Sequence, residues 1–341
     1  MTPINMQKIQ KIQKIQKIQS NINLIDLFAG TGAFSHSFLR NNNIKCVFAN
    51  DMVDESEKIY NLNHEDITLT KKDLMTIDIK DIPSHDISCN GFSCQPFSIA
   101  GEQKGFEDVR SNVFWKMIDI IKYHKPRFAI LENVKNLQSH NKGITFSIIC
   151  ENLEKCGYFI KYKILDTCKI TEVPQHRERI YIICFKNKDD YEKFDFDFPI
   201  VQNKSIKDYL EKDINNKYYY TNKLKVYDEI EKNIVKNIDE NIIYQYRRYY
   251  VRENKNSVCP TLTANMGGGG HNVPLLLDNK GIRKLTPREC FNLQGFPENY
   301  KLPNISDTQL YKLAGNAVSI PVVNLISDKI FKIIDQDSHQ K

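Results

Sequence analysis

The side chain with the clearest capacity for covalent chemistry is the thiol of Cys94, within residues 91–98. The apolar residues 86–90 predict a strand that leads directly into this segment. Open α/β sheets bind and transform ligands at the carboxyl ends of their strands. Gly91 permits a sharp turn after the strand, and Pro96 fixes the backbone beyond the thiol. Most free cysteines are small core residues, so Cys94 becomes a candidate nucleophile only together with other reactive groups.

Three ionisable side chains stand at the ends of other predicted strands. Glu132 follows the apolar residues 127–131, where a carboxylate is costly to desolvate unless it is paired or used. Burial raises the pKa of a carboxyl group and lets it act as a general acid. Arg177 and Arg179 precede the apolar residues 180–185. Because they are one residue apart at the start of a strand, they project to the same face.

A third group of residues is suited to binding a nucleoside. Residues 22–28 predict a buried strand, and a glycine turn with Gly30 and Gly32 leads into a helix that runs through Leu39. Such a turn lets the backbone approach a ligand closely, although a plain connection between strand and helix has the same pattern. A second strand at 45–49 ends near Asp51, about 20 residues past the glycines, where a carboxylate can accept ribose hydroxyls. Asp73 follows a third apolar run.

The elements that position these residues alternate between strand and helix as far as about residue 190. This order predicts an α/β fold with a doubly wound, mostly parallel sheet. The alternation stops near residue 194, and lysine, asparagine and tyrosine dominate as far as residue 280. We therefore divide the chain into a low-complexity Lys-Ile-Gln tail, a catalytic and cofactor-binding domain, a smaller irregular domain and a segment that returns to the first domain: residues 1–20, 21–190, 191–280 and 281–341.

Composition narrows the class of protein. The 341 residues are 41% hydrophobic and 26% charged, as in ordinary globular proteins, and we find neither an apolar run of membrane-spanning length nor a signal peptide. Nine cysteines without a disulfide framework favour a reducing cytoplasm. Cys89 and Cys94 form the closest pair and no second pair follows, so we predict no metal site. The net charge of +6 fits a polyanionic partner but is a weak indication alone.

Taken together, these motifs resemble the C5-cytosine-specific DNA methyltransferases of bacterial restriction-modification systems, in both order and spacing. Residues 26–32 resemble the cofactor motif of that family, and residues 91–98 its Pro-Cys nucleophile motif. Ser93 replaces the proline that usually precedes the cysteine. Residues 132–134 and 175–179 resemble two further catalytic motifs. Near the C-terminus, residues 283–290 and 314–318 resemble the last two motifs.

The resemblance implies a Rossmann-like methyltransferase fold that uses S-adenosyl-L-methionine as methyl donor. It implies that Cys94 adds to C6 of cytosine, which makes C5 nucleophilic enough to accept the methyl group. Glu132 would protonate N3, Arg177 would hold O2, and Arg179 would support the site by pairing with a nearby acid. The implied cofactor contacts are Phe28, Ala29, Gly30, Thr31, Gly32, Asp51, Met52, Asp73, Leu74, Asn316 and Ala317.

The same resemblance makes double-stranded DNA the partner and residues 191–280 the target-recognition region. The target cytosine must then be flipped out of the duplex, because the chemistry cannot reach a stacked base. Residues 245–252 mix arginine and tyrosine, which suits phosphate contacts but also suits a solvated strand pair. The expected DNA contacts are Ser98, Arg247, Arg248, Arg252 and Thr261. We expect a cytoplasmic monomer with a cognate restriction endonuclease.

Three alternatives remain at this stage. A tRNA-methylating member of the family would have consecutive prolines before the nucleophile and a Cys-Phe-Thr element, and neither is present. A catalytically silent DNA-binding relative would have lost one of Cys94, Glu132 and Arg177. A nicotinamide dehydrogenase is disfavoured because Ser35 stands where the third glycine of the dinucleotide fingerprint would be.

Overall fold

The structure is a computed structural model, and it describes residues 22–92, 112–222, 227–234, 242–247, 250–266, 268 and 273–338. Cys94, Ser98, Arg248 and the tail at 1–20 therefore lie outside the described residues. Within the described ranges, no helix is both long and apolar enough to cross a membrane.

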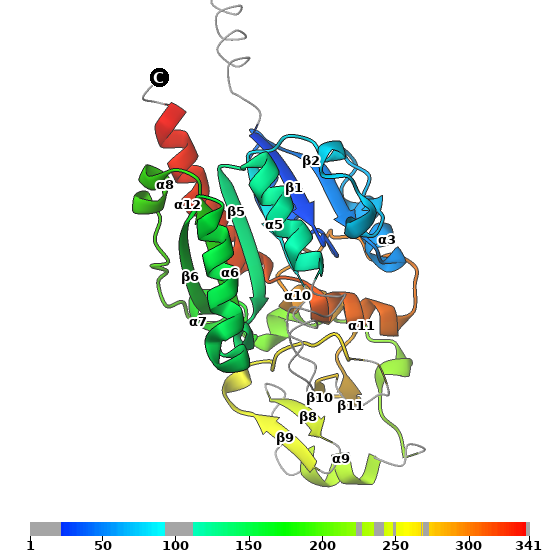
Figure 1. Cartoon of the computed structure of the whole chain (residues 1–341). Helices are drawn as coiled ribbons and strands as arrows, with labels where there is room; N and C mark the ends of the chain where they lie inside the picture. The colour runs from blue at the N-terminus through cyan, green and yellow to red at the C-terminus, as the bar shows by residue number, and fades with distance from the viewer. Residues whose placement is uncertain are drawn as a thin grey trace, which may run out of the picture.

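A seven-stranded sheet forms the larger part of the molecule (Figure 1), with the strand order β3-β2-β1-β4-β5-β7-β6. Its neighbouring strands are parallel except where β7 pairs in antiparallel fashion with β5 and with β6. The predicted doubly wound, mostly parallel sheet is thus confirmed. The strands are β1 (Ile22–Leu27), β2 (Ile44–Asp51), β3 (Thr70–Lys71), β4 (Ile87–Asn90), β5 (Phe128–Val134), β6 (Phe159–Asp166) and β7 (Glu178–Phe185).

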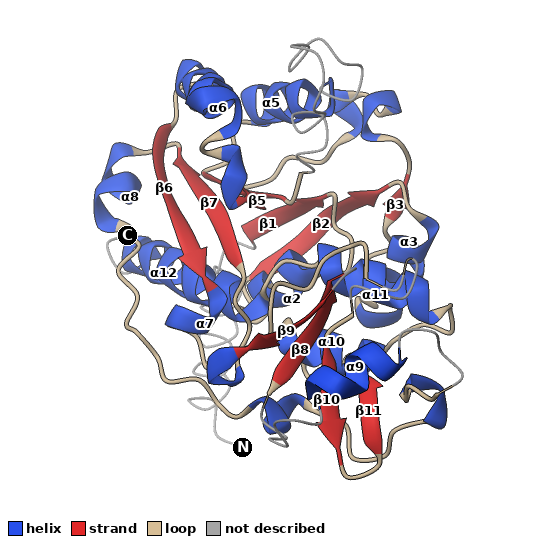
Figure 2. Ribbon diagram, turned by 90° about the horizontal axis from the view of Figure 1, so that it is seen from below, coloured by secondary structure: helices blue, strands red, loops and turns tan. Residues whose placement is uncertain are grey.

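Helices cover both faces of this sheet (Figure 2). Successive side chains of a strand point to opposite faces, and a sheet covered on both sides needs apolar residues on each. In β7, Ile182 packs with α5 and α6, whereas Ile183 packs on the side of α2 and α12. The helices are α2 (Ala33–Phe38), α3 (Asp54–Asn63), α5 (Asn112–His124), α6 (Ile144–Lys155), α7 (Thr167–Ile170), α8 (Lys188–Lys193) and α12 (Ile320–Ser338).

Between the helices and strands, short 3-10 turns connect the elements. The third apolar run, residues 67–69, lies just before β3, whose residues Thr70 and Lys71 pair with the end of β2. The Asn50 amide donates to the carbonyls of Thr70 and Lys72 there. The turns are η1 (Leu74–Thr76), η2 (Ile79–Asp81), η4 (Lys135–Leu137), η5 (His140–Gly143), η6 (Ile206–Tyr209), η7 (Asn216–Tyr218) and η8 (Lys255–Ser257).

A second, four-stranded antiparallel sheet lies in the smaller lobe (Figure 1), with the order β11-β10-β8-β9. It comprises β8 (Ile243–Arg247), β9 (Tyr250–Asn254), β10 (Leu275–Asp278) and β11 (Gly281–Lys284), and α9 (Tyr227–Ile234) packs on it through Ile230 and Ile234. The domain boundary predicted between 280 and 281 falls inside the β10–β11 hairpin. Both of these strands belong to the smaller sheet.

The C-terminal segment returns to the large sheet, because α12 packs on α2. Thr286 caps α10 (Pro287–Leu293) in a capping box with Glu289, as its sequence predicts, and Gly295 ends the turn with φ of 85°. In the last motif, residues 314–316 form the final turn of α11 (Asp307–Asn316), Ala317 is its C-cap, and α12 begins only at Ile320.

Candidate active site

The reversed direction of β7 brings two distant motifs to one edge of the sheet. β5 runs toward this edge and ends at Val134, whereas β7 starts there. In the antiparallel register, Arg179 lies opposite Val134 and Tyr181 lies opposite Glu132. Residues from the end of one strand and the start of the other therefore become neighbours, although more than 40 residues separate them in the sequence.

Glu132 and Arg179 form an ion pair at this edge, with 3.1 Å between Oε1 and Nε. Both side chains are largely buried, and burial raises the pKa of the Glu132 carboxyl although the charges of Arg179 and Arg177 oppose the rise. The expectation that Arg179 pairs with a nearby acid is confirmed. A carboxyl group with a raised pKa beside a guanidinium can donate a proton while the cation stabilises developing negative charge.

Arg177 has a different environment, although it lies only two residues away. Its side chain is 2% exposed, and the guanidinium donates to the backbone carbonyls of three residues: Leu262 at 2.9 Å, Gly315 at 3.1 Å and Ala317 at 2.6 Å. Burial, with the neighbouring charge of Arg179, lowers the pKa of Arg177 to about 9. These contacts favour a positioning role for Arg177 over the expected contact with O2 of a cytosine, because both terminal nitrogens already donate to the protein itself.

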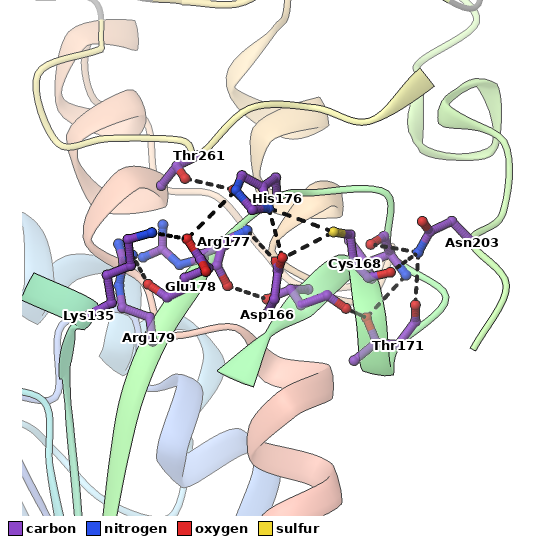
Figure 3. Close-up of polar contacts among 12 residues, drawn as sticks. Lys135, Asp166, Cys168, Thr171, His176, Arg177, Glu178, Arg179, Asn203 and Thr261 are labelled. Atoms are coloured by element: carbon purple, nitrogen blue, oxygen red, sulfur yellow. Dashed lines mark hydrogen bonds and ion pairs between the residues drawn. The ribbon is translucent and has the colours of Figure 1, made fainter. Parts of the chain in front are cut away.

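The segment that carries Thr261 is attached directly to the loop before β7. The backbone nitrogen of His176 donates to the carbonyl of Cys259 at 2.8 Å, and the hydroxyl of Thr261 donates to the carbonyl of His176 at 2.6 Å (Figure 3). The segment also touches α11, since a Cβ at Gly315 would lie 2.2 Å from the carbonyl carbon of Thr263. The region predicted to bind DNA is thus hydrogen-bonded to the backbone of the loop that leads to Arg177 and Arg179.

Asn133 connects the end of β5 to the backbone of Phe92, just after β4. Its side-chain amide donates to the carbonyl of Phe92 at 3.0 Å, and both groups are buried. Phe92 is the last described residue before the segment that contains Cys94. The sequence places Asn133 in a motif but does not predict a role for it. Its position directly after a candidate acid at a strand end was the available indication.

The glycine turn after β1 adopts a strained path that favours its residue types. Phe28 has a positive φ of 58°, which is uncommon for a residue other than glycine, and Gly32 has φ of 70°. A Cβ at Gly32 would lie 2.3 Å from Nε2 of His64, so the turn accepts only glycine there. The backbone nitrogen of Gly30 donates to Oδ2 of Asp51 at 2.9 Å. This bond brings the turn and the end of β2 together, as predicted for a ligand cradle.

The remaining predicted cofactor residues differ in their exposure. Met52 is 66% exposed, although it is a large apolar side chain directly after Asp51. Asp73 caps η1 by accepting from the nitrogen of Met75 at 2.9 Å, and it follows β3, which pairs with β2 beside Asp51. Ala29, Thr31, Leu74 and Ala317 are buried and Asn316 is exposed. An exposed apolar group beside a carboxylate and an open glycine turn fit a nucleoside cofactor.

Three of the predicted DNA contacts, Arg247, Arg252 and Thr261, lie among the described residues. Arg252 is exposed on β9, two residues from Tyr250, which is 57% exposed on the same face of the strand. Arg247 ends β8 and lies opposite Tyr250 in the register. The described residues on either side, 243–247 and 250–254, form the strand pair that the sequence left open, and Tyr250 and Arg252 share one face of β9.

Comparison with known proteins gives a consistent result. A model of the C-5 cytosine-specific DNA methylase family matches residues 22–332. The type II methyltransferase M.Bsp6I of Bacillus sp. (strain RFL6) is 44% identical over 315 residues, which cover 91% of this chain and 99% of that protein. M.HhaI of Haemophilus parahaemolyticus is 34% identical and covers 91% and 94%. The structure of the S. pombe Dnmt2 methyltransferase superposes with a TM-score of 0.70 at 23% identity, over 92% of this chain and 99% of that one.

Proposed function

The chain belongs to the C-5 cytosine-specific DNA methylase family, and we propose that it methylates C5 of a flipped cytosine in a short duplex sequence through a covalent adduct with Cys94. It is a C5-cytosine DNA methyltransferase of the kind found in type II restriction-modification systems. The observation that carries the proposed mechanism is the buried pair of Glu132 and Arg179, in which a carboxyl group and a guanidinium lie side by side.

The pair matches the electronic demand of the reaction. C5 of cytosine is a weak nucleophile, and the Cys94 thiolate forms a bond to C6 that displaces electron density toward N3 and O2. These two ring positions are neighbours, so a proton donor and a cation about 3 Å apart can serve both at once. Glu132 protonates N3 and Arg179 stabilises O2. C5 then accepts the methyl group, and water takes the C5 proton. The ring is restored when the thiolate leaves C6 and N3 returns its proton to Glu132.

Arg177 acts in this scheme as a positioning residue. It binds the carbonyl of Leu262 from the recognition region and those of Gly315 and Ala317 from the last motif. A single buried side chain thereby holds both segments next to the catalytic edge. We propose that Arg177 sets the relative placement of the target base and the methyl donor without touching either.

S-adenosylmethionine, the methyl donor of this family, supplies an electrophilic methyl group when bound. We propose that the turn of Phe28–Gly32 and the carboxylate of Asp51 hold its nucleoside part, with the exposed Met52 packing on the adenine. Asp73 and Leu74 would border the adenine, and Asn316 and Ala317 would close the pocket. Each oxygen of Asp51 accepts one backbone hydrogen bond and has a further lone pair available for a ribose hydroxyl.

Recognition of the duplex is assigned to the smaller lobe. Arginines neutralise phosphates, and exposed tyrosines beside them stack or donate hydrogen bonds. Flipping the target cytosine costs a few kcal/mol, which contacts in the pocket must offset. We propose DNA contacts at Ser98, Arg247, Arg248, Arg252 and Thr261, in a cytoplasmic monomer that protects its site from a cognate restriction endonuclease.

Expression of the chain in a methylation-free bacterial host tests the proposed activity directly. Bisulfite sequencing of the host DNA should show C5-methylcytosine confined to one short sequence context. Glu132→Gln, which keeps the shape of the side chain but cannot donate the same proton, should lower the methylated fraction about 100-fold or more. Methylation absent from every cytosine context in cells that accumulate folded wild-type protein would refute the proposal.

Removal of the Asp51 carboxylate tests the cofactor assignment. Asp51→Ala should weaken S-adenosylmethionine binding at least tenfold in calorimetry, because the ribose hydroxyls lose an ionised acceptor and the turn loses the bond to Gly30. Asp54→Ala offers a control, since Asp54 lies close by in α3 but pairs with Lys71 at the surface. Equal affinities in both variants would exclude Asp51 as a cofactor contact.

A further inference from the structure

Three side chains that the reaction does not use converge beside the loop before β7. Asp166 ends β6, Cys168 lies in the short helix α7, and His176 lies in the loop that leads to Arg177 (Figure 3). One ligand atom from each, a carboxylate oxygen, a sulfur and a ring nitrogen, lies within 4.8 Å of the other two. Asp166 is buried, Cys168 is partly exposed and His176 is 54% exposed at the side chain. The cluster is thus anchored on one side and open to solvent on the other.

The distances among these atoms are close to those of a tetrahedral zinc site. Nδ1 of His176 lies 2.7 Å from Oδ2 of Asp166 and 3.9 Å from Sγ of Cys168, and this sulfur lies 3.4 Å from Oδ1 of Asp166. Bond lengths of about 2.0 Å to nitrogen and oxygen and about 2.3 Å to sulfur require separations of about 3.3 Å between nitrogen and oxygen and about 3.5 Å to sulfur. Because the two contacts involve different oxygens of Asp166, the carboxylate must also turn so that one oxygen faces both other ligands.

The hydrogen bonds within the cluster occupy the positions that a cation would take. Asp166 accepts from the thiol of Cys168 at Oδ1 and from the ring of His176 at Oδ2, so one proton lies on each side of the carboxylate. Asp166 also accepts from the backbone nitrogen of Arg177 at 3.1 Å. This last bond orients the carboxylate, as hydrogen bonds to metal ligands commonly do. Carboxylate, thiolate and imidazole together suit a borderline-soft divalent cation.

We propose that Asp166, Cys168 and His176 form a binding site for a zinc-class divalent cation, with water as the fourth ligand. Binding displaces the proton of the Cys168 thiol, which is released to the buffer, while the ring proton of neutral His176 moves from Nδ1 to Nε2. The spacing of the cysteines does not predict a metal site, because a single cysteine contributes to this one. This site instead takes one ligand from each of three segments. Since His176 also holds Cys259 and Thr261 through its backbone, the cation would brace the attachment of the recognition region.

Cobalt(II) binding to the full-length protein tests this site with a readout independent of methylation. A thiolate ligand on Co²⁺ gives a charge-transfer band in the near ultraviolet, and tetrahedral coordination gives intense visible bands. The wild type should bind one Co²⁺ per chain with both features, and Zn²⁺ should displace it. Cys168→Ser should remove the charge-transfer band, and His176→Gln should weaken binding at least tenfold.

Cys156→Ser is the matched control, because Cys156 is also a partly exposed free cysteine but lies at the end of α6, outside the cluster. It should retain the wild-type spectrum. Thermal unfolding gives a second measurement: Zn²⁺ should raise the midpoint of the wild type and of Cys156→Ser but not of Cys168→Ser. The proposal would be overturned if the wild-type protein lacked the charge-transfer band, or if Cys168→Ser showed the band at equal intensity. Neither result would bear on the methyltransferase activity.

Discussion

Cys94→Ser should abolish the covalent complex that the wild-type protein forms with a duplex carrying 5-fluorocytosine at the target position. Fluorine at C5 cannot leave as a proton does, so elimination stops after methyl transfer and the bond to C6 persists. A protein–DNA band that survives denaturation should therefore form only when S-adenosylmethionine is present. Serine should not replace cysteine, because a hydroxyl is far less nucleophilic near neutral pH.

Cys89 is the natural control for this experiment. It lies five residues earlier on β4 and is fully buried, and desolvation raises the pKa of its thiol well above the usual range. A buried neutral thiol is inert, so Cys89→Ser should trap DNA as the wild type does. Trapping that is retained in Cys94→Ser and lost in Cys89→Ser would identify the other thiol as the nucleophile.

The second large effect separates the two arginines. Arg179→Ala should lower kcat about 100- to 1,000-fold, because it removes one donor aimed at developing charge. It should cost less stability than Arg177→Ala, because the buried Glu132 carboxyl left without its partner can take up a proton. Arg177→Ala should instead lower the free energy of unfolding by about 3 kcal/mol or more, since three buried carbonyls lose their partner. Denaturant titration and single-turnover methylation measure the two quantities separately.

Lysine substitutions sharpen this contrast. Lysine keeps the positive charge but not the planar fork that reaches several acceptors. Arg177→Lys should therefore still be destabilised, whereas Arg179→Lys should recover part of kcat because it preserves the charge near O2. If Arg177→Lys unfolded like the wild type and lost kcat 100-fold, Arg177 would be the group that touches the base.

Part of the candidate site could be predicted, because the functional side chains of α/β proteins gather at the carboxyl ends of the strands. Asp51 and Glu132 were found in this way, and both lie at the same edge of the sheet. The glycine turn could also be predicted from the sequence. Gly32 has a positive φ, and a Cβ at this position would collide with the His64 ring, so the turn favours glycine. These features depend on local sequence and on the general geometry of parallel sheets.

The roles of the arginines could not be predicted from local pattern. Alternation places Arg177 and Arg179 on one face of a strand, but it does not reveal which position will be covered by other segments. Arg177 is covered by residues 85 and 138 positions further along the chain. The same limit applies to Asp166, because its proximity to His176 depends on the path of the segment between them.

The contact between Gly315 and Thr263 has a consequence for exchanging specificity between enzymes of this kind. A side chain at Gly315 would collide with the backbone of the recognition segment, not with a movable side chain. A transplanted recognition module must therefore reproduce the main-chain path near Thr263, whereas its side chains in the smaller sheet can vary. A chimera that keeps both Gly315 and the main chain near Thr263 from the host keeps the host's packing between them. A chimera that replaces the main chain near Thr263 must take Gly315 and its helix from the same donor protein.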